Sequence, residues 1–177
     1  PSLNFWQRTH ESILCCSKNK RPTFNRDAVR EPYTSTYLKN SVGKVRKATV
    51  GRFSNGTKET KYSAHENGAL PRDVIKISAL AGGAGKKERV NHPTQKPLEL
   101  CEKLIKACIP THSTEIDVSL VGIPLMVVPL MVVPFAGSGS ELVSAQKLNI
   151  NCIGFELNNE YVDLCKQRLY DSNSNYI

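Results

Sequence analysis

Two glycines in a strand–turn–helix pattern are the residues whose type and spacing most directly suggest ligand binding. Gly137 and Gly139 follow a short apolar run and precede a helical stretch. Glycines leave no side chain between the backbone and a ligand, and the first turn of a helix presents unpaired N–H groups. A Gly-x-Gly turn alone is a weak signal, because an ordinary tight turn has the same composition.

An acidic residue strengthens that signal. Glu156 ends the next predicted strand, Asn151 to Glu156. A carboxylate at this place can accept hydrogen bonds from both ribose hydroxyls of a nucleoside cofactor, as in dinucleotide-binding folds. The combination predicts a nucleoside-cofactor site, although these residues alone also allow a tight turn beside a solvated acid.

The sequence around these residues alternates between strand and helix patterns. It predicts a strand at Leu130 to Val133, a short helix at Glu141 to Leu148, a buried strand at Asn151 to Glu156 and an amphipathic helix at Asn159 to Tyr170 with Tyr161, Leu164, Cys165 and Leu169 inward. Elements in this order form a βαβ unit of a parallel sheet, for which a right-handed crossover is expected. The predicted fold class is therefore α/β.

A further amphipathic helix is predicted upstream of this unit. Its inward residues recur at spacings of three and four and are Leu98, Cys101, Leu104, Ile105 and Cys108. We expect Thr94 to be its N-cap and Pro97 to lie in its first turn.

An apolar run, Val118 to Val133, separates this helix from the glycine turn. It contains a tandem repeat of Pro-Leu-Met-Val-Val, and its prolines are Pro124 and Pro129. The run is shorter than the about 20 residues that a bilayer requires, so a membrane span is not predicted. Because each proline removes a ladder donor, only Leu130 to Val133 is expected to form a strand.

The charge of the chain favours a polyanionic partner. The formal net charge is +8, and each Lys or Arg placed on a phosphate releases counterions. Between residues 39 and 90 hydrophobic residues are few, and the candidate phosphate contacts are Lys44, Arg46, Lys47, Arg52 and Lys58, with Phe53 and Tyr62 interleaved. A DNA-facing segment and a solvated, partly disordered loop both remain open.

Six cysteines are present, and their arrangement does not suggest a disulfide framework or a metal site. Cys15 and Cys16 are adjacent, and neither CxxC nor Cys/His zinc spacing occurs. We expect reduced core thiols in a cytoplasmic protein. The chain opens at Pro1 without a secretory pattern, which is compatible with a fragment, and Trp6 to Ser17 reads as a strand at the edge of a larger sheet.

Several segments together resemble one enzyme family, the DNA N6-adenine and N4-cytosine methyltransferases that use S-adenosylmethionine. They are Pro134 to Gly139, Gly154 to Leu157, Glu160-Tyr161 with Arg168-Leu169, His92 to Pro97 and the opening Arg8 to Tyr33. The order of the segments is similar to the class in which the catalytic motif comes first and a DNA-recognition segment lies between the two halves.

The resemblance implies a cofactor site and a division of the chain. The implied S-adenosylmethionine contacts are His92, Thr94, Lys96, Phe135, Ala136, Gly137, Ser138, Gly139 and Glu156, with His92, Thr94 and Lys96 at the carboxylate end of the cofactor. Residues 1–38 would be a central part of a Rossmann-like methyltransferase sheet with helices on both faces. Residues 39–90 would be a loop-rich target-recognition insertion, and residues 91–177 the cofactor-binding βαβ portion.

Two departures from the family pattern have chemical consequences. The catalytic Asp-Pro-Pro-Tyr or Ser-Pro-Pro-Tyr, which holds the target amine and stacks on a flipped base, does not occur, so we assign no catalytic residue. Val133 stands where the family usually has an Asp that faces the cationic end of the cofactor, and Asp117 is the nearest candidate. We therefore expect weakened cofactor binding and no methyl transfer by this chain alone.

The leading hypothesis is a site-specific DNA methyltransferase of the restriction-modification type, with adenine N6 favoured as the target. Its expected partners are double-stranded DNA and a separate N-terminal methyltransferase chain, with no membrane and no metal. A non-catalytic DNA-binding remnant and an RNA or small-molecule methyltransferase are the alternatives. The basic segment before His92 favours a nucleic-acid substrate over a small molecule.

Overall fold

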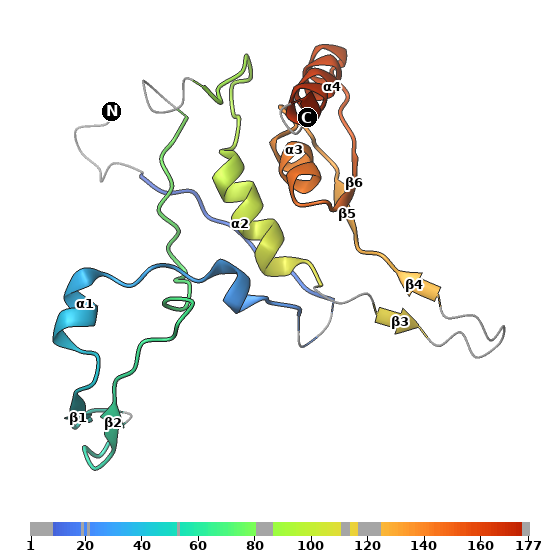
Figure 1. Ribbon diagram of the computed structural model, residues 1–177. Coiled ribbons are helices and arrows are strands. Elements are labelled where there is room, and N and C mark those ends of the chain that lie inside the picture. Colours follow the sequence, from blue (N-terminus) through green and yellow to red (C-terminus); the bar gives the residue numbers. More distant parts are fainter. Residues whose placement is uncertain are drawn as a thin grey trace.

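The structure is a computed structural model that describes residues 9–18, 20, 22–52, 54–80, 87–110, 114–116 and 125–174. Over these residues the chain is α/β, with helices and three two-stranded sheets (Figure 1). Of the predictions above, those on Phe53, Asp117 and the first part of the repeated apolar run lie outside the described residues.

The C-terminal part forms the predicted βαβ unit. Strand β5 (Leu130–Val133) is followed by helix α3 (Ser140–Lys147), strand β6 (Asn151–Gly154) and helix α4 (Asn159–Ser174). Strands β5 and β6 pair in parallel, with Val132 beside Ile153. The predicted parallel pairing is confirmed, and the element bounds agree to within a few residues.

The core of the described chain lies on one face of this sheet. Val133, Ala136, Leu142 and Cys165 form a buried cluster, and Met131, Cys152 and Leu169 pack against it. Tyr161 and Leu164 are half-buried, so the predicted inward face of the last helix is confirmed.

The opposite face of the sheet is exposed, which corrects the prediction of a buried strand. The exposed fractions are 54% for Val132 and 46% for Ile153, and Phe155 is also exposed. Strand residues point alternately to the two faces, and within the described part of the chain helices cover one face only. The expected second layer of helices is therefore not seen there.

Helix α2 (Leu98–Cys108) packs against α3 and confirms the upstream helix. Cys101 and Ile105 are buried as predicted, whereas Cys108 is exposed. The prediction of Thr94 as N-cap is wrong, because Pro97 occupies that position. The Glu88 carboxylate instead accepts a hydrogen bond from the Leu98 amide at 2.7 Å and satisfies one free donor of the first turn.

The apolar repeat forms one strand more than predicted. Strand β4 (Leu125–Val127) pairs in antiparallel fashion with β3 (Thr114–Ile116). Pro129 lies between β4 and β5, so the missing donor falls outside both ladders. The repeat therefore places its two copies in two different sheets.

The N-terminal part differs most from the prediction. Residues 9–18 are irregular and exposed, so the predicted strand at 6–17 is wrong over its described residues. No described strand pairs with this segment, and an unpaired strand is not stable in water. Cys15 and Cys16 are consequently exposed, which corrects the expectation of core thiols, although all six cysteines are free as expected.

The segment that follows carries a basic hairpin on an extended arm. A 3-10 helix, η1 (Arg26–Val29), precedes helix α1 (Ser35–Asn40). Strand β1 (Val45–Lys47) then pairs with β2 (Glu59–Lys61) in antiparallel fashion. Figure 1 shows this hairpin projecting away from the C-terminal unit. We call residues 38–62 the basic arm.

Two kinds of feature are absent from the described residues. None of the helices in that part of the chain is both long and apolar enough to cross a membrane. The same residues contain no group of three or more His, Cys, Asp or Glu side chains that could hold a metal ion.

Candidate functional site

The glycine turn after β5 has the backbone geometry that only glycine adopts without strain. Gly137 has φ +53° and Gly139 has φ +75°, both in the left-handed region. The Ala136 amide donates to the Phe155 carbonyl at 2.8 Å, which continues the β5–β6 pairing into the turn. The turn therefore lies at the carboxyl ends of both strands, where open α/β sheets bind ligands.

Glu156 closes the far side of this turn. Its Oε2 accepts a hydrogen bond from the Gly137 amide at 2.7 Å, and its Oε1 accepts from the Leu157 and Asn158 amides at 2.9 Å each. The amides of Asn158 and Gly137 hold the pKa of this carboxyl below its ordinary value. An ionised carboxylate offers about four acceptor positions, so it can still accept from a ligand hydroxyl.

His92 lies directly against the glycine turn. A Cβ built on Gly137 would lie 3.0 Å from the His92 Nε2, so a larger residue would push the ring away. The ring meets Tyr161 of α4 edge-on, with centroids 4.5 Å apart, and its Nδ1 accepts from the Thr94 amide at 3.3 Å. Nε2 is the ring atom that faces the turn.

A short closed loop holds His92 in this place. The Gln95 Nε2 donates to the Glu88 carbonyl at 2.8 Å, and the Gln95 Oε1 accepts from the Val90 amide at 2.8 Å. No role was predicted for Gln95 or Glu88. The position of Gln95 within the family-like segment was a signal for it, but nothing in the sequence marks Glu88 as the cap of α2.

Side chains of helix α4 donate hydrogen bonds to the carbonyl groups of the glycine turn. The Cys165 thiol donates to the Gly137 carbonyl at 3.3 Å, and the Arg168 Nη1 donates to the Ser138 carbonyl at 2.5 Å. Arg168 also reaches the Ser140 hydroxyl at 3.2 Å, and burial lowers the pKa of its guanidinium. These contacts occupy the Gly137 and Ser138 carbonyls, so α4 fixes the backbone of the turn.

The structure brings most of the predicted cofactor residues together. Those at the turn are His92, Ala136, Gly137, Ser138, Gly139 and Glu156, and Thr94 joins them through its amide. Phe135 is 90% exposed beside the turn. Lys96 is engaged elsewhere, because its Nζ lies 2.5 Å from the Glu11 Oε2, so its predicted place at the carboxylate end of a cofactor stays a prediction.

The predicted DNA-binding residues gather on the basic arm. The register pairs Val45 with Lys61 and Arg46 with Thr60, so Arg46 lies on the face opposite to Val45. The Arg46 Nη2 donates to the Asn40 carbonyl at 3.2 Å, and its guanidinium lies 5.6 Å from the Tyr62 ring centroid. Arg46 therefore ties the hairpin to the end of α1, in addition to any contact with a ligand.

The remaining basic residues of the arm are exposed. The Lys47 Nζ lies 3.8 Å from the Glu59 Oε1, with three quarters of the lysine side chain accessible. Lys44, Arg52 and Lys58 are exposed as well. Their predicted role as phosphate contacts stays a prediction.

Comparison with known proteins identifies a family. Residues 1–167 match the sequence profile of a family described as DNA methylase. The Type II methyltransferase M1.MboII of Moraxella bovis is 32% identical over 157 residues, which cover 86% of this chain and 51% of that protein. The Type II methyltransferase M.HpaI of Haemophilus parainfluenzae is 32% identical over 90% of this chain and 38% of its own length.

A third relative and a solved structure are similar to parts of the chain. The Type II methyltransferase M.ScaI of Streptomyces caespitosus is 29% identical over 67% of this chain and 34% of its own length. A crystal structure of an M1.HpyAVI–SAM complex is 33% identical, with a TM-score of 0.35 over 46% of this chain and 33% of that chain. The chain thus spans about half or less of the length of the relatives it matches.

Proposed function

This chain belongs to the S-adenosylmethionine-dependent DNA amino-methyltransferases, and from that premise we propose that it is the cofactor-binding and DNA-recognition portion of a site-specific DNA methyltransferase. The proposed enzyme is of the restriction-modification type and acts on DNA in the cytoplasm. Adenine N6 is the proposed target, on the overall resemblance described above.

One arrangement carries the cofactor proposal. The Gly137 amide donates to Glu156 while the His92 ring lies over the same glycine, so three segments meet at one turn. A nucleoside cofactor needs an ionised acceptor for its ribose hydroxyls at the carboxyl ends of the strands, and Glu156 supplies that acceptor. The donor set thus fits S-adenosylmethionine, which supplies a methyl group on a sulfonium that an amine lone pair can attack.

The fit is incomplete at the methionine end. Val133 is buried in the core cluster at the end of β5 and offers no carboxylate to the ammonium group of the cofactor. His92 and Lys96 remain as the residues that would hold the carboxylate of the cofactor, with Lys96 released from Glu11. We therefore propose that the affinity for S-adenosylmethionine is weaker than in relatives with an acidic residue at that position.

The absence of Asp-Pro-Pro-Tyr from the 177 residues separates binding from catalysis. Without a group that accepts hydrogen bonds from the target amine, attack on the methyl group lacks its geometry. We propose that this chain binds cofactor and DNA through its own residues and methylates only with a separate piece that supplies the motif. A DNA-binding remnant without catalysis is the second candidate, favoured by Val133 and by the tandem apolar repeat.

Calorimetric titration with S-adenosylmethionine tests the cofactor proposal. We expect measurable binding by the unaltered chain and about ten-fold weaker binding by Glu156→Gln, because a charged hydrogen-bond acceptor for the ribose is lost. Glu160→Gln is the matched control, since this exposed carboxyl lies in the first turn of α4 and has no contact with the turn. Equal affinity of the unaltered chain and Glu156→Gln would remove the assignment.

A further inference from the structure

The two ends of the basic arm return to one place in the structure, which we call the arm base (residues 30–37 and 63–69). Glu31 and Ala69 exchange two backbone hydrogen bonds there, with N···O distances of 2.9 and 2.7 Å. Gly68 has φ +99°, and a Cβ on it would collide with the Glu31 carbonyl. The two segments thus approach as closely as backbones can, and only glycine fits at this position.

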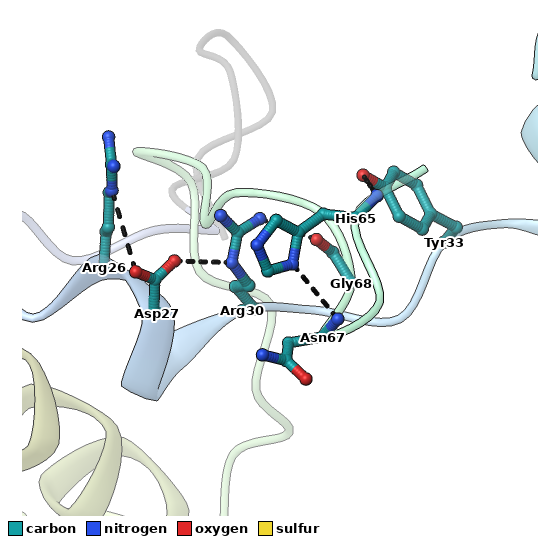
Figure 2. Close-up of polar contacts among 7 residues, drawn as sticks. All are labelled: Arg26, Asp27, Arg30, Tyr33, His65, Asn67 and Gly68. Atoms are coloured by element: carbon teal, nitrogen blue, oxygen red, sulfur yellow. Dashed lines mark hydrogen bonds and ion pairs between the residues drawn. The ribbon is translucent and has the colours of Figure 1, made fainter. Parts of the chain in front are cut away.

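Arg30 is the side chain that holds this junction. Its Nη1 donates to the Gly68 carbonyl at 2.7 Å and its Nε donates to the Asp27 Oδ1 at 2.7 Å (Figure 2). Only 9% of the Arg30 side chain is exposed, compared with 65% for Arg26, which lies 4.0 Å from the other oxygen of the same carboxylate. Arg30 is therefore too enclosed to serve as a phosphate contact, whereas Arg26 is free to do so.

Two tyrosines extend the junction toward the arm. The Tyr33 hydroxyl accepts from the His65 amide at 3.1 Å, and the Tyr37 hydroxyl donates to the Ser63 carbonyl at 3.4 Å. Their rings stack with centroids 4.9 Å apart. Each of these hydrogen bonds joins residues 30–37, which precede the arm, to residues 63–69, which follow it. The two segments are therefore held together where the arm begins and ends.

The arm base is also fixed to helix α2. Glu31 of the base forms an ion pair with Lys103 of α2. Just before the base, the Asn25 backbone N–H donates to the Ala107 carbonyl at 2.7 Å and Val29 of η1 is buried. The loop before α2 carries His92, which lies against the glycine turn. A continuous series of contacts therefore connects the arm, through its base and α2, to the cofactor site.

We infer that Arg30 is a positioning residue that sets the orientation of the DNA-binding arm relative to the cofactor turn. The inference rests on the proposed function, in which the arm binds DNA and the turn binds the methyl donor. A methyltransferase of defined specificity needs a fixed separation between the bases that it recognises and the base that it modifies. Arg30 and the arm base supply that separation here, because Arg30 joins the two segments of the base and Glu31 joins the base to α2.

Hydrogen exchange on the full chain tests the junction without DNA. In Arg30→Ala we expect the amides of Glu31 and Ala69 to exchange about ten-fold faster, because a charged hydrogen bond at the junction is lost, while the amides of α3 stay protected. Arg26→Ala removes the same charge from the same carboxylate and should leave both amides unchanged. Unchanged exchange at Ala69 in Arg30→Ala would overturn the inference. If Arg30→Ala fails to fold, Arg30→Lys serves instead, since a lysine cannot reach Asp27 and Gly68 together.

Gel-shift titration of duplex DNA at several salt concentrations tests the role in binding. We expect Arg30→Ala to bind about ten-fold more weakly with an unchanged salt slope, since an unfixed arm must be ordered on binding while its phosphate contacts remain. Arg26→Ala should lose at most one unit of slope, as one surface charge does. An equal decrease of the salt slope in Arg30→Ala and Arg26→Ala would mean that Arg30 acts only as a surface charge, and would overturn the inference. Failure of the unaltered chain to bind DNA would count against the proposed function, and hydrogen exchange would still decide the junction.

Discussion

The Glu156 carboxylate accepts a hydrogen bond from the Gly137 amide at 2.7 Å and so joins the end of β6 to the turn that follows β5. Residues 19 positions apart thereby lie together at one edge of the sheet. The same carboxylate is the acceptor proposed for the ribose, so its ionisation connects the stability of the turn with cofactor binding.

That connection predicts a pH dependence of stability. The folded chain holds the pKa of Glu156 below its ordinary value of 4.5, because the amides of Asn158 and Gly137 donate to the ionised form. A depressed pKa stabilises the folded state above the unfolded pKa, and the contribution is lost as pH falls through the folded pKa. Thermal midpoints should therefore fall more steeply below pH 4.5 for the unaltered chain than for Glu156→Gln. Parallel curves for the two proteins would contradict this expectation.

Two glycines with a left-handed backbone conformation should lose different amounts of stability when they are replaced by alanine. One is Gly139 in the glycine turn, and the other is Gly43, just before β1. Gly139 has φ +75° and a Cβ on it would lie 2.9 Å from the Cys165 Sγ, whereas Gly43 has φ +82° with nothing within 4 Å. Gly43→Ala should lose about 1–2 kcal/mol of the free energy of unfolding through backbone strain alone. Gly139→Ala should lose about 1–3 kcal/mol more through overpacking. Urea denaturation measures the free energy of unfolding of both variants. Equal decreases would mean that the Cys165 side chain moves aside without loss of stability.

The basic arm predicts a local salt dependence of DNA binding. Replacing Lys44 and Lys47 by Gln should reduce the slope of log affinity against log salt by up to about two units, if each lysine meets a phosphate. Lys147→Gln with Lys166→Gln is the matched control on α3 and α4, since Lys47, Lys147 and Lys166 each lie within 3.8 Å of a carboxylate oxygen. Equal slopes for the two double variants would mean that the arm is a solvated surface that does not contact DNA phosphates.

The missing catalytic motif predicts no methyl transfer by the chain alone. A radiolabelled transfer assay on adenine-containing duplex DNA should stay at background, since nothing holds the target amine in line with the methyl group. Activity is expected when an N-terminal piece with Asp-Pro-Pro-Tyr is added. Robust transfer without that piece would mean that another group, such as Asn158 or Asn159, holds the target.

The exposed face of the sheet provides a control for this complementation. Val132 and Ile153 lie side by side on that face, and each is about half exposed. A lysine at position 132 would place a charge in any contact that covers the face, so Val132→Lys should abolish complementation while cofactor binding persists. Complementation by Val132→Lys at the level of the unaltered chain would show that the added piece docks elsewhere.

The cysteines predict a simple pattern of chemical modification. Burial raises the pKa of the Cys101 thiol to about 12, and burial also raises the pKa of Cys165. Cys15 and Cys16 are exposed on an irregular segment. Because the thiolate is the reactive form, iodoacetamide at about pH 8 should label Cys15 and Cys16 first. Mass spectrometry of the digested protein measures the order, and early labelling of Cys101 would contradict the packing of α2 on α3.

The amino-acid sequence by itself determined the local elements of the cofactor site. Gly137 and Gly139 predict a tight turn, the spacing of Leu98 to Cys108 predicts an amphipathic helix, and the alternation of strand and helix patterns after Leu130 predicts a βαβ unit. These features depend on residues near one another in the chain, so periodicity and glycine content are sufficient to predict them. The family-like segments added the predicted role of Glu156, and the hydrogen bond to Gly137 places this carboxylate at the turn.

The tertiary structure alone decided which distant residues meet. Glu88 caps α2 in place of Thr94, His92 lies over Gly137, and Arg30 reaches Gly68 across 38 residues. None of these contacts can be predicted from the periodicity of the sequence, because each depends on how separate segments pack. The burial of a strand is decided in the same way, since β6 has an apolar sequence but remains exposed on the face that no described element covers.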